Sequence, residues 1–166
     1  MHVVVMGVTG CGKSTVGGLL AASLGAEFAD GDGFHSEEAV AKMAGNIPLT
    51  DADRWPWLAR VGAWLAGDDK RVVACSALKR AYRDAIREHA PDVVFVHLNA
   101  PQDVLEARVA KRARLTGHFA GPGLLDSQFA ILEALAFDER GVVIDVTEVG
   151  PDEAVALARE ALDKEI

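Results

Sequence analysis

The chain has 166 residues, half of them hydrophobic, and its 25 acidic and 17 basic side chains give a formal net charge of −8. This length suits one domain with a substantial core, and the acidic balance argues against a nucleic-acid backbone as the main partner. No apolar run approaches the roughly 20 residues of a membrane span, so we expect neither a membrane partner nor a nucleic-acid partner.

The two cysteines, Cys11 and Cys75, form no metal-ligand cluster and fit a reduced protein better than a disulfide scaffold. The N-terminal residues enter a core strand directly, and no signal or transit peptide is visible. We therefore expect a cytoplasmic location.

The first predicted elements flank a glycine-rich loop. Residues 2–6 are apolar and β-branched, which predicts a buried strand, and residues 13–24 are apolar at helical spacing, which predicts a helix. Residues 7–15 between them fit the pattern G-x-x-x-x-G-K-[ST] in the strand–loop–helix context that this motif requires. Backbone N–H groups of such a loop turn inward on phosphates, and the new helix adds its positive end.

We therefore expect the loop to bind ATP. Lys13 is expected to reach the β- and γ-phosphate oxygens, and Ser14 to supply an oxygen to Mg²⁺. The alternative is a glycine-rich turn without a ligand, which the Lys-Ser pair and the flanking elements disfavour. The candidate nucleotide-binding residues of the loop are Gly7, Thr9, Gly10, Cys11, Gly12, Lys13, Ser14 and Thr15.

An acidic pair follows the second predicted strand, residues 27–30. Asp30 and Asp32 are separated by a single glycine. Phosphoryl transfer to an alcohol needs a group that accepts the hydroxyl proton and ligands for the metal, so we expect Asp30 to serve Mg²⁺ and Asp32 to accept the proton. The alternative is a polar turn, because Asp-Gly is also ordinary turn chemistry.

The rest of the chain alternates between predicted helices and strands. Short uninterrupted apolar runs are typical of strands covered on both faces, and this alternation predicts an α/β fold with a parallel sheet. Ligands of such sheets gather at the C-terminal ends of the strands. We expect helices over 37–44, 53–66, 78–89, 101–114, 122–135 and 151–165, and strands over 72–75, 93–98 and 142–146.

Further blocks of the sequence resemble the gluconokinases over residues 3 to about 146. The resemblance implies ATP-dependent phosphorylation of D-gluconate at its C6 hydroxyl to 6-phosphogluconate, usually by a homodimer. It also implies a P-loop fold of the nucleoside-monophosphate-kinase type: one three-layer domain with a five-stranded parallel sheet, a lid at about 108–128 and a substrate-binding helical region at about 34–66. The blocks that carry it are His35, 42–43, 48–58, 75–83, 117–119, 124–129, Leu132 and Glu133.

A sugar acid needs cations for its carboxylate and polar groups for its hydroxyls. Arg54, Lys79 and Arg83 are candidates because they follow strand ends or helix starts, and arginine binds carboxylates bidentately. Arg54 has an alternative role as an ion-pair partner of Asp51 or Asp53. His35 is expected to hydrogen-bond a sugar hydroxyl or to orient Asp32.

The basic segment from Arg108 to His118 is the expected lid. Arg108 and Arg112 share one face of a helix, whereas Arg114 is turned away. We expect Arg108 and Arg112 to contact phosphate, with Arg112 acting as a catalytic residue beside Lys13 and Asp32. His118 is a candidate substrate contact. The alternative for such a segment is a solvated basic surface.

The sequence departs from the gluconokinase pattern at Ser36 (usually Pro), Ala39 (usually Asn), Leu115 (usually Arg) and Ala134 (usually Pro). These departures leave open a related kinase for another small hydroxy acid, such as a shikimate kinase, although residues 75–79 differ from that family. A nucleotide-binding regulator without turnover is a further alternative, against which Lys13 and the acidic pair argue.

Overall fold

The computed structural model describes residues 1–117 and 123–165 and contains a five-stranded sheet in the order β2-β3-β1-β4-β5. All neighbouring strands are parallel, which confirms the predicted α/β fold class. The predicted strands are each correct to within one residue. The strands are β1 (His2–Met6), β2 (Glu27–Asp30), β3 (Arg71–Ala74), β4 (Val94–Asn99) and β5 (Gly141–Asp145).

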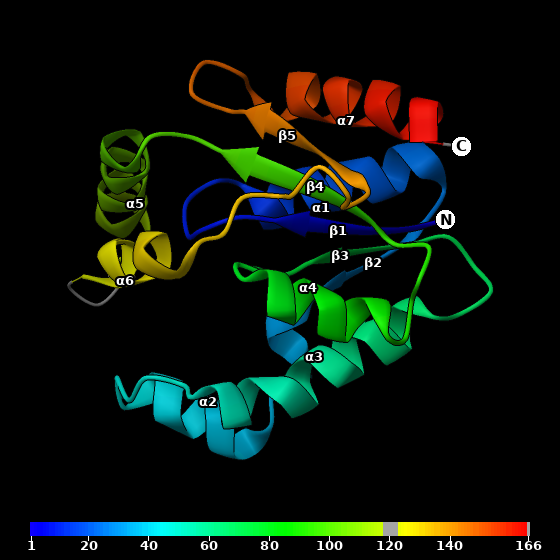
Figure 1. Ribbon diagram of the computed structural model, residues 1–166. Helices are drawn as coiled ribbons and strands as arrows, with labels where there is room; N and C mark the ends of the chain where they lie inside the picture. Colours follow the sequence, from blue (N-terminus) through cyan, green and yellow to red (C-terminus); the bar gives the residue numbers. More distant parts are fainter. Residues whose placement is uncertain (118–122, 166) are drawn as a thin grey trace.

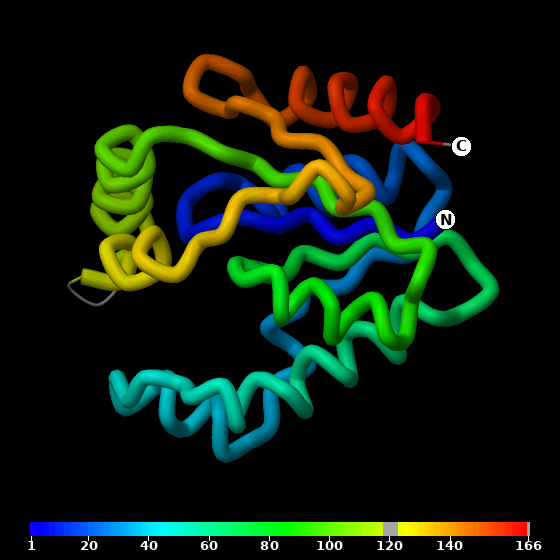
Figure 2. Tube along the Cα trace, viewed as in Figure 1, coloured from blue at the N-terminus to red at the C-terminus, as the bar shows by residue number. Residues whose placement is uncertain are grey.

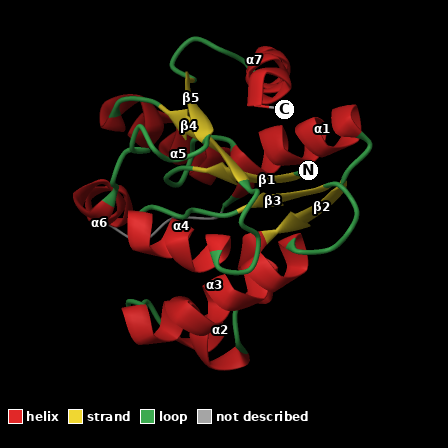
Figure 3. Ribbon diagram, turned by 45° about the vertical axis from the view of Figure 1, so that its right-hand side comes forward, coloured by secondary structure: helices red, strands yellow, loops and turns green. Residues whose placement is uncertain are grey.

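Helices cover both faces of the sheet, as Figures 1 and 3 show. One face packs against α1 (Lys13–Leu24) and α7 (Pro151–Glu165), and the other against α3 (Asp51–Leu65) and α4 (Arg80–Arg87). Each face encloses its own hydrophobic core. The sheet is therefore the middle of three layers.

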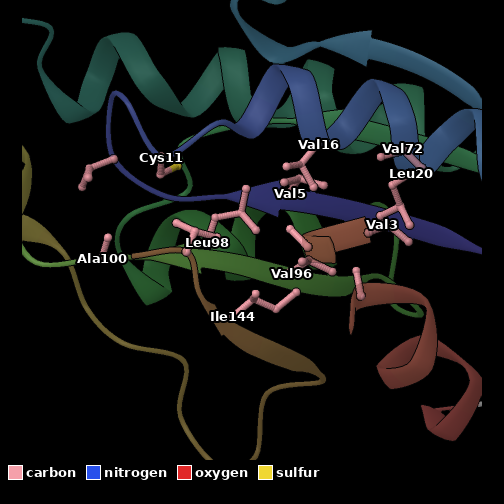
Figure 4. Close-up of a cluster of buried hydrophobic side chains, with 14 of the residues drawn as sticks. Val3, Val5, Cys11, Val16, Leu20, Val72, Val96, Leu98, Ala100 and Ile144 are labelled. Carbon is pink, nitrogen blue, oxygen red and sulfur yellow. The ribbon is translucent and has the colours of Figure 1, made fainter. Parts of the chain in front are cut away.

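The two cores follow from the two-residue period of a strand. In β1, Val3 and Val5 point into the core under α1 and α7, where Figure 4 shows Val5 beside Val16 and Val3 beside Leu20. Val4 and Met6 point into the other core. All four β1 side chains are fully buried, so β1 lies at the centre of the molecule.

The remaining elements are η1 (Gly31–Phe34), α2 (Glu37–Ala44), α5 (Gln102–Thr116) and α6 (Leu124–Ile131). In Figure 1, α5 and α6 lie beyond the C-terminal ends of β1 and β4, at the opposite end of the molecule from the two termini. Among the described residues, no helix combines the length and apolar character needed to cross a membrane.

Four predicted helices differ from the structure by two or more residues at an end: 53–66, 78–89, 101–114 and 122–135 correspond to α3, α4, α5 and α6. Local hydrogen bonds account for two of these differences. α3 begins at Asp51 rather than 53, because Thr50 and Asp53 form a capping box at its start. α6 ends at Ile131 rather than 135, because the Glu133 N–H donates to the Leu78 carbonyl oxygen at 2.8 Å instead of continuing the helix. A connector, residues 132–140, then leads to β5 and can be followed in yellow and orange in Figure 2.

Candidate active site

The glycine-rich loop connects β1 to α1 at the C-terminal edge of the sheet. Gly7 has a φ of 144°, and a Cβ there would lie 2.6 Å from the Cys11 Sγ, so only glycine fits. Cys11 itself is buried, with 4% of its surface exposed. Gly12 adopts a left-handed conformation and starts α1, whose first-turn N–H groups have no partner within the helix. The loop thus presents backbone donors at the positive end of a helix.

A cavity of about 630 Å³ opens between this loop and α5. Arg108 and Arg112 line it from one face of α5, as their four-residue spacing predicts, and Arg114 is not among the lining residues. The Arg108 Nη2 donates to the carbonyl oxygens of Val146 (2.6 Å) and Thr147 (3.1 Å), which ties α5 to the segment after β5. The described lining residues are Thr9, Gly10, Gly12, Lys13, Ser14, Thr15, Arg108, Val109, Arg112 and Thr116. The Lys13 Nζ, on the loop side, donates to the Val8 carbonyl oxygen at 3.2 Å. Two arginines of α5 therefore face the loop and Lys13 across a space suited to phosphates.

The acidic pair adjoins this cavity. Asp30 ends β2, and its Oδ2 accepts a hydrogen bond of 2.8 Å from the Ser14 hydroxyl. Its Oδ1 accepts from the Asp32 N–H at 3.0 Å, which caps η1 and fixes the two carboxylates relative to each other. Mg²⁺ prefers such hard oxygen ligands. The Ser14 and Asp30 oxygens beside the phosphate loop therefore fit the metal that the sequence predicts.

Side chains of α3 donate hydrogen bonds to the backbone of the acidic turn and of the residues that follow it. The Trp57 indole N–H donates to the Gly31 carbonyl oxygen at 2.8 Å, and the Arg60 Nε donates to the Phe34 carbonyl oxygen at 2.6 Å. The His35 ring stacks on Trp57 with centroids 4.2 Å apart. Burial lowers the pKa of His35 below its usual value, despite the opposing charge of Asp32, so the ring is neutral at neutral pH. Trp57 is buried in the core, and the sequence gives no local sign of its bond to the acidic turn, 26 residues away.

Two cations, one from α3 and one from the start of α4, meet at one aromatic ring. The Arg54 Cζ and the Lys79 Nζ lie 5.5 Å and 5.6 Å from the centroid of the Tyr82 ring. Asp51 accepts hydrogen bonds from the Tyr82 hydroxyl at 2.6 Å and from the Arg54 Nη1 at 3.1 Å. Arg54 therefore forms the ion pair with Asp51 that was predicted from the sequence as its alternative role. It also lies at the same Tyr82 ring as Lys79.

Arg83 does not belong to this group, and its predicted role as a substrate ligand is wrong. Its side chain is fully buried and forms an ion pair with Glu139, with Nε–Oε1 at 2.8 Å. Its other donors bond to Glu139 and to the carbonyl oxygens of Ala77, Leu78 and Ala134. Because the five N–H groups of a guanidinium are all used inside the protein, none is left for a substrate.

Three of the departures from the gluconokinase pattern have a clear place in the structure. The Ser36 hydroxyl accepts from the Ala39 N–H at 3.1 Å and caps α2, so Ser36 gives this helix a good start. Ala39 is buried, and Leu115 is 76% exposed on α5. His118 lies outside the described residues.

Sequence reasoning assigned no role to Gln128. This residue of α6 accepts a hydrogen bond of 2.7 Å at its Oε1 from the Thr9 N–H of the phosphate loop. A glutamine on an amphipathic helix gives no local sign of such a contact, because its partner lies 119 residues away in the chain.

Comparisons with known proteins agree with this geometry. A family model described as shikimate kinase matches residues 9–133. A gluconokinase of Gluconobacter oxydans is 45% identical over 82% of this chain and 77% of its own, and the thermosensitive gluconokinase of Escherichia coli is 40% identical over 86% and 78%. The crystal structure of a gluconokinase from Sinorhizobium meliloti superposes with a TM-score of 0.89 at 44% identity, covering 98% of this chain and 91% of that one.

Proposed function

This chain belongs to the gluconokinase family, and from that premise we propose that it transfers the γ-phosphoryl group of ATP to the C6 hydroxyl of D-gluconate. The observation that carries the proposal is the joint placement of two sites around the Asp30-Gly31-Asp32 turn. The phosphate cavity adjoins the turn through the bond between Ser14 and Asp30. α3 packs against the same turn and carries Arg54, which meets Lys79 at the Tyr82 ring.

The phosphate end holds the donor. The backbone N–H groups of the loop and Lys13 bind the phosphates of ATP, and Arg108 and Arg112 approach them from α5. When Mg²⁺ is bound, by Ser14 and Asp30, it neutralises negative charge on the phosphate oxygens. Arg112 and Lys13 stabilise the charge that spreads over the transferring phosphoryl group.

The acceptor end holds gluconate. Arg54 and Lys79 bind its carboxylate, and His35 donates to or accepts from a hydroxyl while the rest of the sugar chain reaches toward Asp32. Asp32 accepts the proton of the C6 hydroxyl as the oxygen forms its bond to the γ-phosphorus. The bond to the β–γ bridging oxygen breaks, and ADP leaves with the electron pair. Catalysis thus depends mainly on positioning and electrostatics.

An acceptor screen tests this assignment. ADP release by the purified protein is measured by a coupled assay with ATP and Mg²⁺ across gluconate, other sugar acids, shikimate and neutral polyols. We expect strong stimulation by gluconate and none by shikimate. Strong stimulation by another acceptor with no response to gluconate would contradict the substrate assignment, and no response to any acceptor would favour a regulator.

We also propose that residues 108–128, which include parts of α5 and α6, form a lid. Residues 34–66 are proposed to bind the substrate, and all 166 residues to form one domain. The chain is further proposed to form a cytoplasmic homodimer. The position of α5 across the phosphate cavity supports the lid. Light scattering of the purified protein measures the oligomeric state, and a monomer mass at micromolar concentration would contradict the dimer.

A further inference from the structure

Gln128 lies at the C-terminal limit of the proposed lid and has no assigned role in phosphoryl transfer, yet it contacts the phosphate loop. Gln128 is half-buried, and its side-chain oxygen accepts from the Thr9 N–H at 2.7 Å. Thr9 lines the phosphate cavity. The donor is the N–H of Thr9, which precedes α1 in the chain. The N–H groups of the first turn of α1, residues 13–15, are therefore not used by Gln128 and stay available for phosphate.

Five residues further on, the same segment holds the loop between β3 and α4. The Glu133 N–H donates to the Leu78 carbonyl oxygen at 2.8 Å, and its Oε1 accepts from the Arg80 N–H at 3.0 Å at the start of α4. The neighbouring Ala77 has a φ of +44°, a conformation that an alanine holds only when its surroundings enforce it. Lys79, the proposed carboxylate ligand, lies between these two bonded positions.

We propose that residues 128–133 form a positioning bridge that fixes the phosphate loop relative to the Lys79 loop, with Gln128 and Glu133 as its positioning residues. The proposal rests on the proposed function, because it assigns ATP to the first loop and gluconate to the second. Phosphoryl transfer depends on the alignment of donor and acceptor, and a displacement of about 1 Å can cost roughly 100-fold in rate. A segment bonded to both loops adds to that alignment, beside the direct bond from the Gly7 N–H to the Ser76 carbonyl oxygen at 3.3 Å.

The first test removes the bond to Thr9 while keeping the size of the side chain. In Gln128→Met we expect kcat with ATP and gluconate to fall about 10-fold or more, with the KM for gluconate and the melting temperature close to wild type. Gln128→Glu keeps an acceptor oxygen, so its kcat at saturating ATP should stay near wild type while its KM for ATP rises by charge repulsion. Gln102→Met is the matched control, since Gln102 bonds to Glu106 and Asp126 and to neither loop.

The second test asks whether the two ends act in series. Glu133→Ala should lower kcat several-fold, and Gln128→Met/Glu133→Ala should be no slower than the slower single variant, because a bridge opened at one end transmits nothing from the other. Multiplying losses would show two independent structural roles and overturn the bridge.

Two further results would also overturn it. One is a wild-type kcat in Gln128→Met, and the other is tighter ADP binding by that variant in calorimetry, which would make Gln128 a competitor of phosphate. If wild-type protein does not phosphorylate gluconate, the proposed function fails separately, and the same variants are compared with the acceptor that the screen identifies.

Discussion

At the scale of single residues, the two carboxylates of the acidic turn have different surroundings, which supports the separate tasks proposed for them. Asp30 bonds to Ser14 at the phosphate loop, whereas the Asp32 side chain is exposed beside His35 and Trp57. One carboxylate therefore lies against the phosphate loop, and the other is exposed. Their spacing of one residue on a tight turn makes this division possible.

Replacing Asp32 tests its task as proton acceptor. We expect Asp32→Asn to lower kcat for gluconate by about 100-fold or more, because an amide accepts no proton at neutral pH, while ADP affinity stays within a few-fold of wild type. The measurements are steady-state kinetics and calorimetry. Asp163→Asn, an exposed change on α7, is the control, and an Asp32→Asn enzyme with wild-type kcat would exclude Asp32 as the base.

Residue roles that depend on local pattern could be predicted from the sequence, and those that depend on long-range contacts could not. The shared face of Arg108 and Arg112 follows from helical spacing alone. Arg83 is also basic and also follows a strand along the chain. Its burial against Glu139, which lies 56 residues away in the sequence, cannot be predicted from the residues beside it. The contact between Gln128 and Thr9 was missed for the same reason.

At the scale of elements, the sheet was predicted well because four of its five strands are short, mainly apolar runs between helices; β2, which begins with Glu27 and ends with Asp30, is the exception. Helix ends were harder to predict, since they depend on individual hydrogen bonds. The start of α3 shows this, where the Thr50 hydroxyl accepts from the Asp53 N–H at 3.2 Å and Asp53 accepts in return from the Thr50 N–H at 2.9 Å. Lys42 of α2 bonds to the same Asp53 carboxylate at 2.9 Å. The cap therefore joins two helices of the proposed substrate-binding region.

Removing the cap should weaken this region measurably. We expect Thr50→Ala to cost about 1 kcal/mol of unfolding free energy, a fall of roughly 2–4 °C in melting temperature for a chain of this size. Thermal and urea unfolding followed by circular dichroism give both quantities. Ser127→Ala is the control, because the Ser127 hydroxyl has no recorded partner within residues 1–117 and 123–165. Equal stability of the two variants would show that the capping box contributes nothing.

At the scale of the whole molecule, a buried ion-pair network joins α4 to the connector that enters β5. Glu139 accepts from Arg83 at 2.8 Å and 2.9 Å, from the Arg87 Nη2 at 2.9 Å and from the Ala136 N–H at 2.9 Å. The connector passes between the lid side of the molecule and the last strand of the sheet. The network therefore fixes the path along which α6, the β3–α4 loop and β5 are held together.

This network predicts how stability depends on pH. Burial raises the pKa of Glu139, but the hydrogen bonds from Arg83, Ala136 and Arg87 outweigh it and lower the pKa from 4.5 to about 2. Because the pKa is lower in the folded state, the unfolded state binds more protons as the solution is acidified. The stabilisation by Glu139 is thus complete above about pH 4.5 and is lost as the pH falls toward 2. Urea unfolding of the wild type between pH 7 and 3 should show this loss.

The variant Glu139→Ala should show the network's contribution at neutral pH. It leaves the Arg83 guanidinium buried without a counter-charge, so we expect a loss of about 3–5 kcal/mol in unfolding free energy. Glu160→Ala breaks an exposed pair with Lys164 and should leave the unfolding free energy close to that of the wild type. Glu139→Gln keeps the shape but cannot titrate, so its stability should fall less steeply than that of the wild type between pH 4.5 and 3. Parallel acid profiles for wild type and Glu139→Gln would place the acid sensitivity of the fold in other carboxylates.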